Sequence, residues 1–341
     1  MEEENITTPV PGTFAYTKNT FTLSAAFVFF IGALITGVFH YFRTRFLFPF
    51  CDEFDSMTVG WLLTQQEKVY DTIFSHHTPL AYMITHLVAL LSPSDDLLHF
   101  RMLNPVVFVL SSVILLYIAA RQSGLRAALF LAGTFSLFTG YFFPVWGGQW
   151  VLNNYYSSVF MVLFLMMCIV PVLKGGSLGR RESLFAGILL AFWLSGELLT
   201  VFPLIFVVLI ATLYASLEKV PLHKRMNFAW FTAGCVAVGV VHLIWLLLFG
   251  SVSGFFQQAI TFNSEYYSKY TLGTSIPNMY LTAFDGFIKN IRGLCKPFPS
   301  YTLRDFTYLL LPISIVVVSW RLKMGTVTRI LIAAPVSYTH L

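Results

Sequence analysis

The chain has 341 residues, of which 57% are hydrophobic and 11% are charged. An ordinary soluble domain has about 25% charged residues, and a soluble protein of this length could not bury so much apolar surface. The composition excludes a soluble globular protein. It predicts an all-α, polytopic integral membrane protein with about eight or nine spanning helices.

The net charge of +5 comes from basic residues in short clusters between apolar runs. Such clusters are typical of cytoplasmic loops of membrane proteins. We therefore expect the protein to have a membrane as its partner and not to bind nucleic acid.

The first apolar run, from Phe21 to about Tyr41, is long enough to cross a bilayer. It follows an acidic segment that lacks the basic residues of a signal peptide, so we expect no cleavage there. The topology predicted by the later basic connections makes residues 1–20 a cytoplasmic tail, although Arg43 and Arg45 then lie on the outer side. Six further apolar runs follow, at 103–120, 127–144, 155–173, 184–216, 228–250 and 306–320.

Four basic connections separate these runs and predict the topology. They contain Arg121 and Arg126; Lys174, Arg180 and Arg181; Lys219, Lys224 and Arg225; and Arg321, Lys323 and Arg329. If all four are cytoplasmic, an even number of crossings separates each neighbouring pair. The run 184–216 must then cross twice, with a break at residues 195–197. Residues 43–102 become a large first external loop, and residues 251–305 become a later external loop.

Two short helices are predicted inside the first external loop. The segment 79–91 is apolar but too short to span, so we expect an interfacial or re-entrant helix. Phe54, Met57, Trp61 and Leu62 recur at helical spacing, which predicts a helix over 53–66 along the membrane surface. We treat 1–341 as a single transmembrane domain. Because the last apolar run is cut short, we expect the natural protein to continue beyond it.

Acidic residues at the start of the 53–66 helix allow two interpretations. Asp52 occupies its expected N-cap position and Asp55 follows three residues later, an arrangement similar to a capping box. Acids there are also favoured by the helix dipole. The other interpretation is that these carboxylates carry chemistry at the membrane surface.

The order of motifs in the first loop resembles the GT-C fold membrane glycosyltransferases. These include the protein O-mannosyltransferases and the aminoarabinose lipid A transferase, of the glycosyltransferase family 39 type. The mannosyltransferases carry an Asp-Glu pair followed by His-Pro-Pro-Leu-Ala, and this chain carries Asp52-Glu53 followed by His77-Thr78-Pro79-Leu80-Ala81. The expected topology is also similar over nearly the whole chain, although the motif is confined to 52–81. The resemblance implies a GT-C-like transmembrane bundle whose first external loop carries interfacial helices.

The resemblance also implies an activity. A bacterial member would transfer a sugar, with inversion, from a polyprenyl-phosphate donor to a hydroxyl or amine of a lipid, glycan or protein. The reaction would occur at the outer face of the cytoplasmic membrane. Asp52 is the expected base, and Glu53 is expected to orient the acceptor or support the loop. His77 and Arg101 are expected to hold the leaving phosphate.

Further polar residues are candidates for substrate binding. Cations of the later loop, Lys269, Lys289 and Arg292, could also hold the phosphate, or could simply be solvated. The set from the first loop and the following helices comprises Asp55, Tyr70, Asp71, His76 and Glu197. Glu197 interrupts a long apolar run, where an acid is costly and usually functional. Asn153 or Asn154 could hydrogen-bond a sugar.

No cofactor is certain from the sequence. Residues 146–154 lack the acid that many relatives carry in their second external loop, which argues against a metal bridged by two loops, although a divalent cation stays possible. The alternative from another class is a transporter or lipid flippase without transferase chemistry. Transporters usually show repeated halves with broken helices, whereas the expected break at 195–197 has no counterpart elsewhere in this sequence. A third possibility is a scaffold protein that kept the fold and lost activity.

Overall fold

The computed structural model describes residues 23–46, 51–92, 96–124, 128–129, 153–173, 176–196 and 225–267. Within these ranges the chain is helical and contains no named strand, as the composition predicts. Three of the described helices are long and apolar enough to cross a membrane: His99–Arg121, Tyr155–Val172 and Phe228–Phe249. They coincide with the predicted runs 103–120, 155–173 and 228–250.

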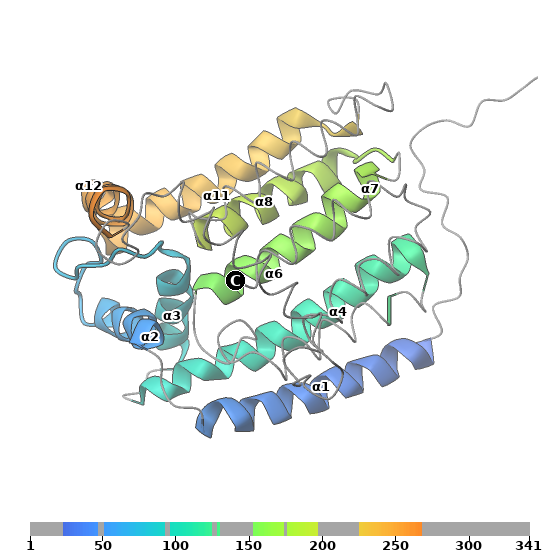
Figure 1. Ribbon diagram of the computed structural model, residues 1–341, viewed down its shortest axis with the longest axis horizontal. Helices are drawn as coiled ribbons and strands as arrows, with labels where there is room; N and C mark the ends of the chain where they lie inside the picture. Colours follow the sequence, from blue (N-terminus) through green and yellow to red (C-terminus); the bar gives the residue numbers. More distant parts are fainter. Residues whose placement is uncertain are drawn as a thin grey trace, which may run out of the picture.

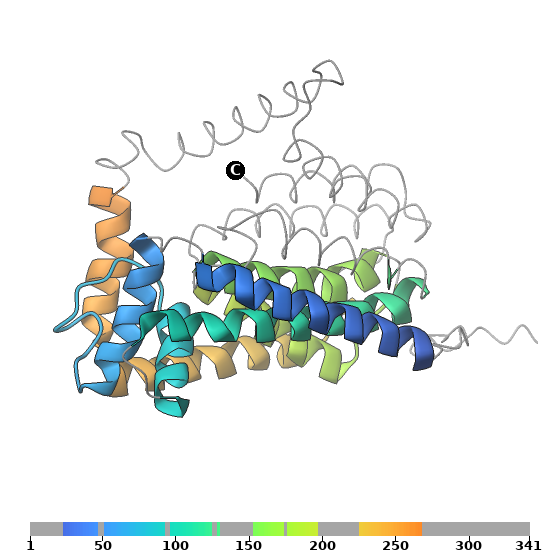
Figure 2. The ribbon, with the colours of Figure 1, turned by 90° about the horizontal axis from the view of Figure 1, so that it is seen from below.

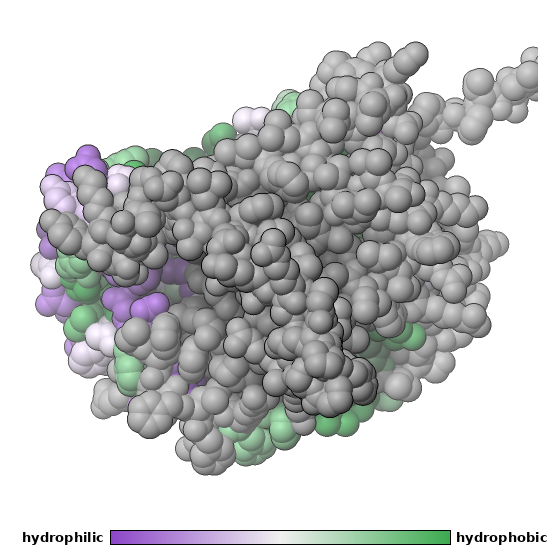
Figure 3. All heavy atoms as spheres, in the orientation of Figure 1, coloured by the Kyte–Doolittle hydropathy of each residue, from purple (hydrophilic) through white to green (hydrophobic). Residues whose placement is uncertain are grey.

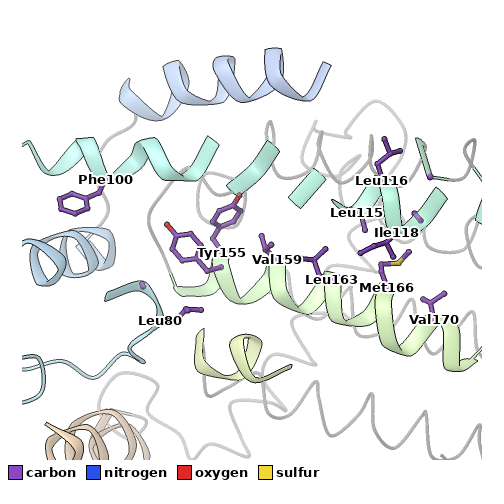
Figure 4. Close-up of a cluster of buried hydrophobic side chains, with 14 of the residues drawn as sticks. Leu80, Phe100, Leu115, Leu116, Ile118, Tyr155, Val159, Leu163, Met166 and Val170 are labelled. Atoms are coloured by element: carbon purple, nitrogen blue, oxygen red, sulfur yellow. The ribbon is translucent and has the colours of Figure 1, made fainter. Parts of the chain in front are cut away.

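Five long helices form a row in chain order (Figure 1). α1 packs against α4, α4 against α6, α6 against α8, and α8 against α11. Their bounds are α1 Leu23–Phe46, α4 Leu103–Ser123, α6 Asn153–Phe164 continued by η3 Leu165–Ile169 and α7 Val170–Leu173, α8 Arg180–Gly196, and α11 Phe228–Phe249. Apolar side chains fill the spaces between them. In Figure 4, Leu115 and Ile118 of α4 lie beside Met166 and Val170.

One end of the row, which we call the loop end, carries the described part of the first external loop. α6 begins there, and its Asn153 Oδ1 atom accepts a hydrogen bond from the N–H of Ala81 in the first loop (2.8 Å). α8 ends there, and the carbonyl of its last residue, Gly196, accepts from the hydroxyl of Thr78 (2.7 Å). α11 also ends there, where the N–H of Val69 donates to the Phe249 carbonyl (3.1 Å).

The opposite end, which we call the arginine end, carries basic residues of three predicted cytoplasmic connections. α4 ends there at Arg121 and Ser123, and α8 begins there at Arg180. Arg225, just before α11, is buried and donates through Nη1 to the carbonyl of Val172 at the end of α7 (2.7 Å). The separation of these arginines from the first loop agrees with the predicted topology, while the side of the membrane each faces stays a prediction.

The directions of the helices also agree with the predicted crossings. α8 and α11 both begin at the arginine end, as two crossings within 184–216 require. α4 ends at the arginine end and α6 begins at the loop end, as a crossing at 127–144 requires. The expected break at 195–197 lies at the edge of the described part. Glu197, the run 306–320 and the cations Lys269, Lys289 and Arg292 lie outside it.

Short helices lie across the loop end of the row (Figures 1 and 2). From the first loop these are α2 Cys51–Thr64, α3 Leu80–Leu91 and η1 Leu97–Met102, and from the later loop α12 Val252–Phe255 and η5 Phe256–Tyr267. The described hydrophilic residues visible in Figure 3 gather at this end. Both predicted helices of the first loop are therefore confirmed as helices, and their depth in a membrane stays a prediction.

One detail of α2 differs from the prediction. The helix begins at Cys51, so Asp52 lies in its first turn and is not its N-cap. Of the apolar residues at helical spacing, Met57 is fully buried, whereas Phe54 is 40% exposed. The buried face is decided by packing against α3, where the Thr85 hydroxyl donates to the Ser56 carbonyl (2.8 Å).

One polar residue lies inside the apolar helix α11. His242 bonds through Nδ1 to the carbonyl of Val238 in its own helix (2.9 Å). Its ring contacts Phe192 of α8, with 6.0 Å between ring centroids.

Candidate functional site

The start of α2 presents three carboxylates in different environments. Asp52 is exposed, Asp55 is half-buried, and Glu53 is fully buried between them. Residues three apart share a face of a helix, so Asp52 and Asp55 point to one side while Glu53 points to another.

Glu53 forms a buried ion pair with Arg101 of η1. The Arg101 Nε atom donates to Glu53 Oε1 at 2.7 Å, and Nη2 donates to Oε2, so the pair is bidentate. Both side chains are almost fully buried. This geometry favours a loop-supporting role for Glu53 over contact with an acceptor. The guanidinium of Arg101, expected to hold the leaving phosphate, binds Glu53 inside the protein, and its expected contact with a lipid phosphate stays a prediction.

A directed chain of hydrogen bonds begins at Asp55. The Tyr82 hydroxyl of α3 donates to Asp55 Oδ2, and the Ser75 and Tyr82 hydroxyls are also bonded to each other. Because a phenol has one proton and an ionised carboxylate only accepts, Ser75 must be the donor to Tyr82. The N–H of His77 in turn donates to the Ser75 hydroxyl (3.1 Å). Asp55 is thus connected to the backbone beside the histidines.

Tyr70 is part of the support of this loop and does not lie on its surface. It has a φ of 63°, in the left-handed region, and its buried hydroxyl donates to the carbonyl of His77 (2.6 Å). Burial, and then the nearby Asp55, raise the pKa of Tyr70 well above its usual value, and the same two causes raise the pKa of Tyr82. Both phenols therefore stay protonated. Tyr70 is buried, and the prediction that it contacts the substrate stays a prediction.

His76 and His77 form a contacting pair of imidazoles beside the two aspartates. Their ring centroids are 4.1 Å apart, and both side chains are half-buried. Burial, and then His77, lower the pKa of His76, whereas Asp55 and Asp52 act in the opposite direction. His76 is therefore mostly neutral at neutral pH. Asp52, Asp55 and His77 all lie close enough to His76 for their charges to act on it.

The other candidates lie in different places. Asp71 is exposed in the turn that follows Lys68, whose carbonyl accepts from the N–H of Asp71 (3.3 Å). Asn153, a candidate sugar ligand, has its amide oxygen bound to the N–H of Ala81, which satisfies one of the unpaired donors at the start of α3. Among the residues that the structure describes, no group of three or more metal-ligating side chains forms.

Four residues that support the site were missed by the sequence analysis: Ser75, Tyr82, Gln258 and Asn263. Tyr82 and Ser75 lie next to the recognised motif, so their proximity was a usable signal. Gln258 and Asn263 lie far along the chain, and they hydrogen-bond the backbone of the 70–77 segment. Nothing in their local sequence indicates this contact.

Comparisons with protein-family models, curated proteins and solved structures found no match for the chain. The functional interpretation therefore rests on the geometry of the loop end and on the residues 52–81.

Proposed function

We propose that the protein is a GT-C-type glycosyltransferase that uses a polyprenyl-phosphate sugar donor at the outer face of a bacterial cytoplasmic membrane. The observation that carries the proposal is the grouping of Asp52, Asp55, His76 and His77 at the loop end of a row of long apolar helices. A lipid donor would present its phosphate and sugar at such an end, where a helix bundle meets water.

Asp52 is the proposed base, because it is the exposed carboxylate of the group. It accepts the proton of the acceptor hydroxyl or amine as that atom attacks the anomeric carbon. The attack comes from the side opposite the phosphate. The bond between the anomeric carbon and the phosphate oxygen breaks, and the polyprenyl phosphate leaves with the electron pair, which inverts the configuration. Asp52 then releases the proton to water.

The remaining residues support this reaction. Neighbouring carboxylates stabilise positive charge that develops on the sugar, and Asp55 is held in place by Tyr82. His76 and His77 supply ring N–H donors for the phosphate oxygens. Glu53 and Arg101 anchor α2 to η1, and so keep the first turn of α2 in position.

The test is turnover by the full-length protein and its Asp52→Asn variant, with labelled polyprenyl-phosphate sugars and membrane extract. Loss of a general base typically lowers the rate by about 10²-fold to 10⁴-fold, so we expect at least a 10²-fold loss of sugar release. Glu182→Gln is the matched control, since it removes the same charge from an exposed residue of α8 at the arginine end.

Equal turnover by wild type and Asp52→Asn would move the base to another residue, with Asp55 the next candidate. Absence of turnover by the wild type with every donor tried would contradict the transferase proposal. It would favour the transporter or flippase, which a flux assay in liposomes would then test.

A further inference from the structure

The described part of the later loop contains a helix that contacts the 70–77 segment of the first loop. This helix, η5, is a π-helix over Phe256–Tyr267 and belongs to the orange segment at the left of Figure 2. The ring of Phe262 lies 5.4 Å from that of Phe74 and 6.1 Å from that of His76, between centroids. Two loops far apart in the sequence therefore meet beside the histidine pair.

Two amide side chains of η5 bind the backbone of the 70–77 segment. Gln258 accepts through Oε1 from the N–H of Ser75 (2.9 Å) and donates through Nε2 to the carbonyl of Tyr70 (3.2 Å). Asn263 donates through Nδ2 to the carbonyl of His76 (2.5 Å). Backbone groups away from water need partners, and these two amides supply them on both sides of Ser75.

The π-helical register explains how both amides reach the same segment. Asn263 follows Gln258 by five residues. In an α-helix, with 3.6 residues per turn, five residues would turn the side chain about 140° past a full circle. In a π-helix, whose hydrogen bonds join residues five apart, the two side chains lie much closer to the same face. Asn263 also donates to the carbonyl of Ala259 within η5 (2.8 Å), which fixes its orientation.

The backbone held by these amides carries the imidazole pair. The carbonyl of His76 is bound by Asn263, and the carbonyl of His77 is bound by the hydroxyl of Tyr70. Both peptide units are therefore restrained by side chains, one from the later loop and one from the first loop.

We propose that Gln258 and Asn263 are positioning residues that hold the His76–His77 pair beside Asp52 and Asp55, so that the imidazoles bind the phosphate of the lipid donor. The identity of the ligand rests on the proposed function. The positioning of the histidines by η5 does not, and it has its own readout.

The experiment compares Gln258→Met and Asn263→Leu in the full-length protein with Gln257→Met. Gln257 is the exposed neighbour of Gln258, so its substitution makes the same chemical change away from the contact with the 70–77 segment. Gln258→Glu is a milder variant, because it keeps an acceptor for Ser75 and loses the donor to Tyr70. Size-exclusion elution and circular dichroism identify any variant that fails to fold.

The first readout is the rate at which diethyl pyrocarbonate modifies His76 and His77, measured by peptide mass spectrometry. We expect a rise of several-fold in Gln258→Met and Asn263→Leu, a smaller rise in Gln258→Glu, and none in Gln257→Met. His99 of η1 is the internal reference. Unchanged rates at His76 and His77 in folded variants would overturn the proposal, whatever the turnover.

The second readout is the KM for the labelled lipid donor. We expect it to rise about tenfold in the two contact variants, which corresponds to about 1.4 kcal/mol of lost binding, with a smaller change in kcat. Faster modification with an unchanged KM would overturn the ligand-binding part. Faster modification without turnover in the wild type would leave the positioning intact and contradict the proposed function.

Discussion

Among single residues, the buried pair of Glu53 and Arg101 has the largest expected effect on stability. Removing two charges from water costs several kcal/mol per ion, and only good geometry and mutual attraction offset this cost. The bidentate contact provides that geometry. Because the pair joins α2 to η1, its loss would also displace the turn that carries Asp52.

We expect Arg101→Met to lower the free energy of unfolding by about 3–5 kcal/mol, since it leaves the Glu53 carboxylate buried without its partner. The double variant Glu53→Gln/Arg101→Met should lose less free energy of unfolding than Arg101→Met alone, because neither side chain of the pair is then charged. Thermal unfolding of the purified protein in detergent measures both. The ion-pair explanation would be contradicted if the loss of unfolding free energy in the double variant equalled the sum of the losses in Glu53→Gln and Arg101→Met.

The acids and histidines of the site could be predicted from the sequence, whereas the role of Arg101 could not. Asp52 and His77 belong to one motif whose order of residues was visible. Arg101 lies 48 residues from Glu53, and an arginine in a loop looks the same whether it faces a phosphate or a buried carboxylate. Burial distinguishes the two roles, and burial is a property of the folded chain.

At the scale of elements, the junction between the 68–77 segment and the end of α11 is the contact on which the site depends. The N–H of Val69 donates to Phe249, and the N–H of Ser251 donates to Val69 (3.0 Å). Gly254 of α12 lies so close to Tyr70 that a Cβ atom there would overlap the Tyr70 carbonyl. Only glycine permits this approach.

We expect Gly254→Ala to destabilise the protein by about 1–3 kcal/mol, because overpacking displaces the Tyr70 backbone. Gly239→Ala is the matched control, since a Cβ atom there meets nothing within 4 Å. In the interior of α11 that change should be neutral, or stabilising by about 0.5–1 kcal/mol. Hydrogen exchange of the 68–77 segment, with thermal unfolding, measures the difference. Equal behaviour of the two variants would contradict a close contact at Gly254.

The α2 helix shows which properties of an element the spacing of apolar residues can predict. Helical spacing predicted its existence and nearly its bounds. Helical spacing did not predict which of its apolar side chains contact protein, because apolar side chains of a surface helix can face lipid as well as protein. The contact of α2 with α3 decides which residues are covered.

For the whole molecule, the described arginines of the predicted cytoplasmic connections lie at one end of the helix row, and the site lies at the other. Positive charge next to spanning helices marks the cytoplasmic side. We therefore expect the loop end to face the outside of the cell.

This orientation predicts the labelling of two exposed positions. In a protein without its native cysteines, Asp71→Cys should react with an impermeant thiol reagent added to intact cells. Arg181→Cys, at the start of α8, should react only after the membrane is permeabilised. Both side chains are exposed in the structure, so a difference reports the side of the membrane. The reverse pattern would invert the topology and contradict the proposed site of action.

The sequence by itself determined that the chain is helical, where its long apolar helices lie, and which acids and histidines are candidates for the site. These follow from composition, apolar run length and local order, all of which act over a few neighbouring residues. Only the tertiary structure decided that Arg101 is bound to Glu53, that Tyr70 supports the loop from inside, and that Gln258 and Asn263 hold the histidine segment. Each of these depends on burial and on contacts between residues distant in the chain, which packing of the elements brings about.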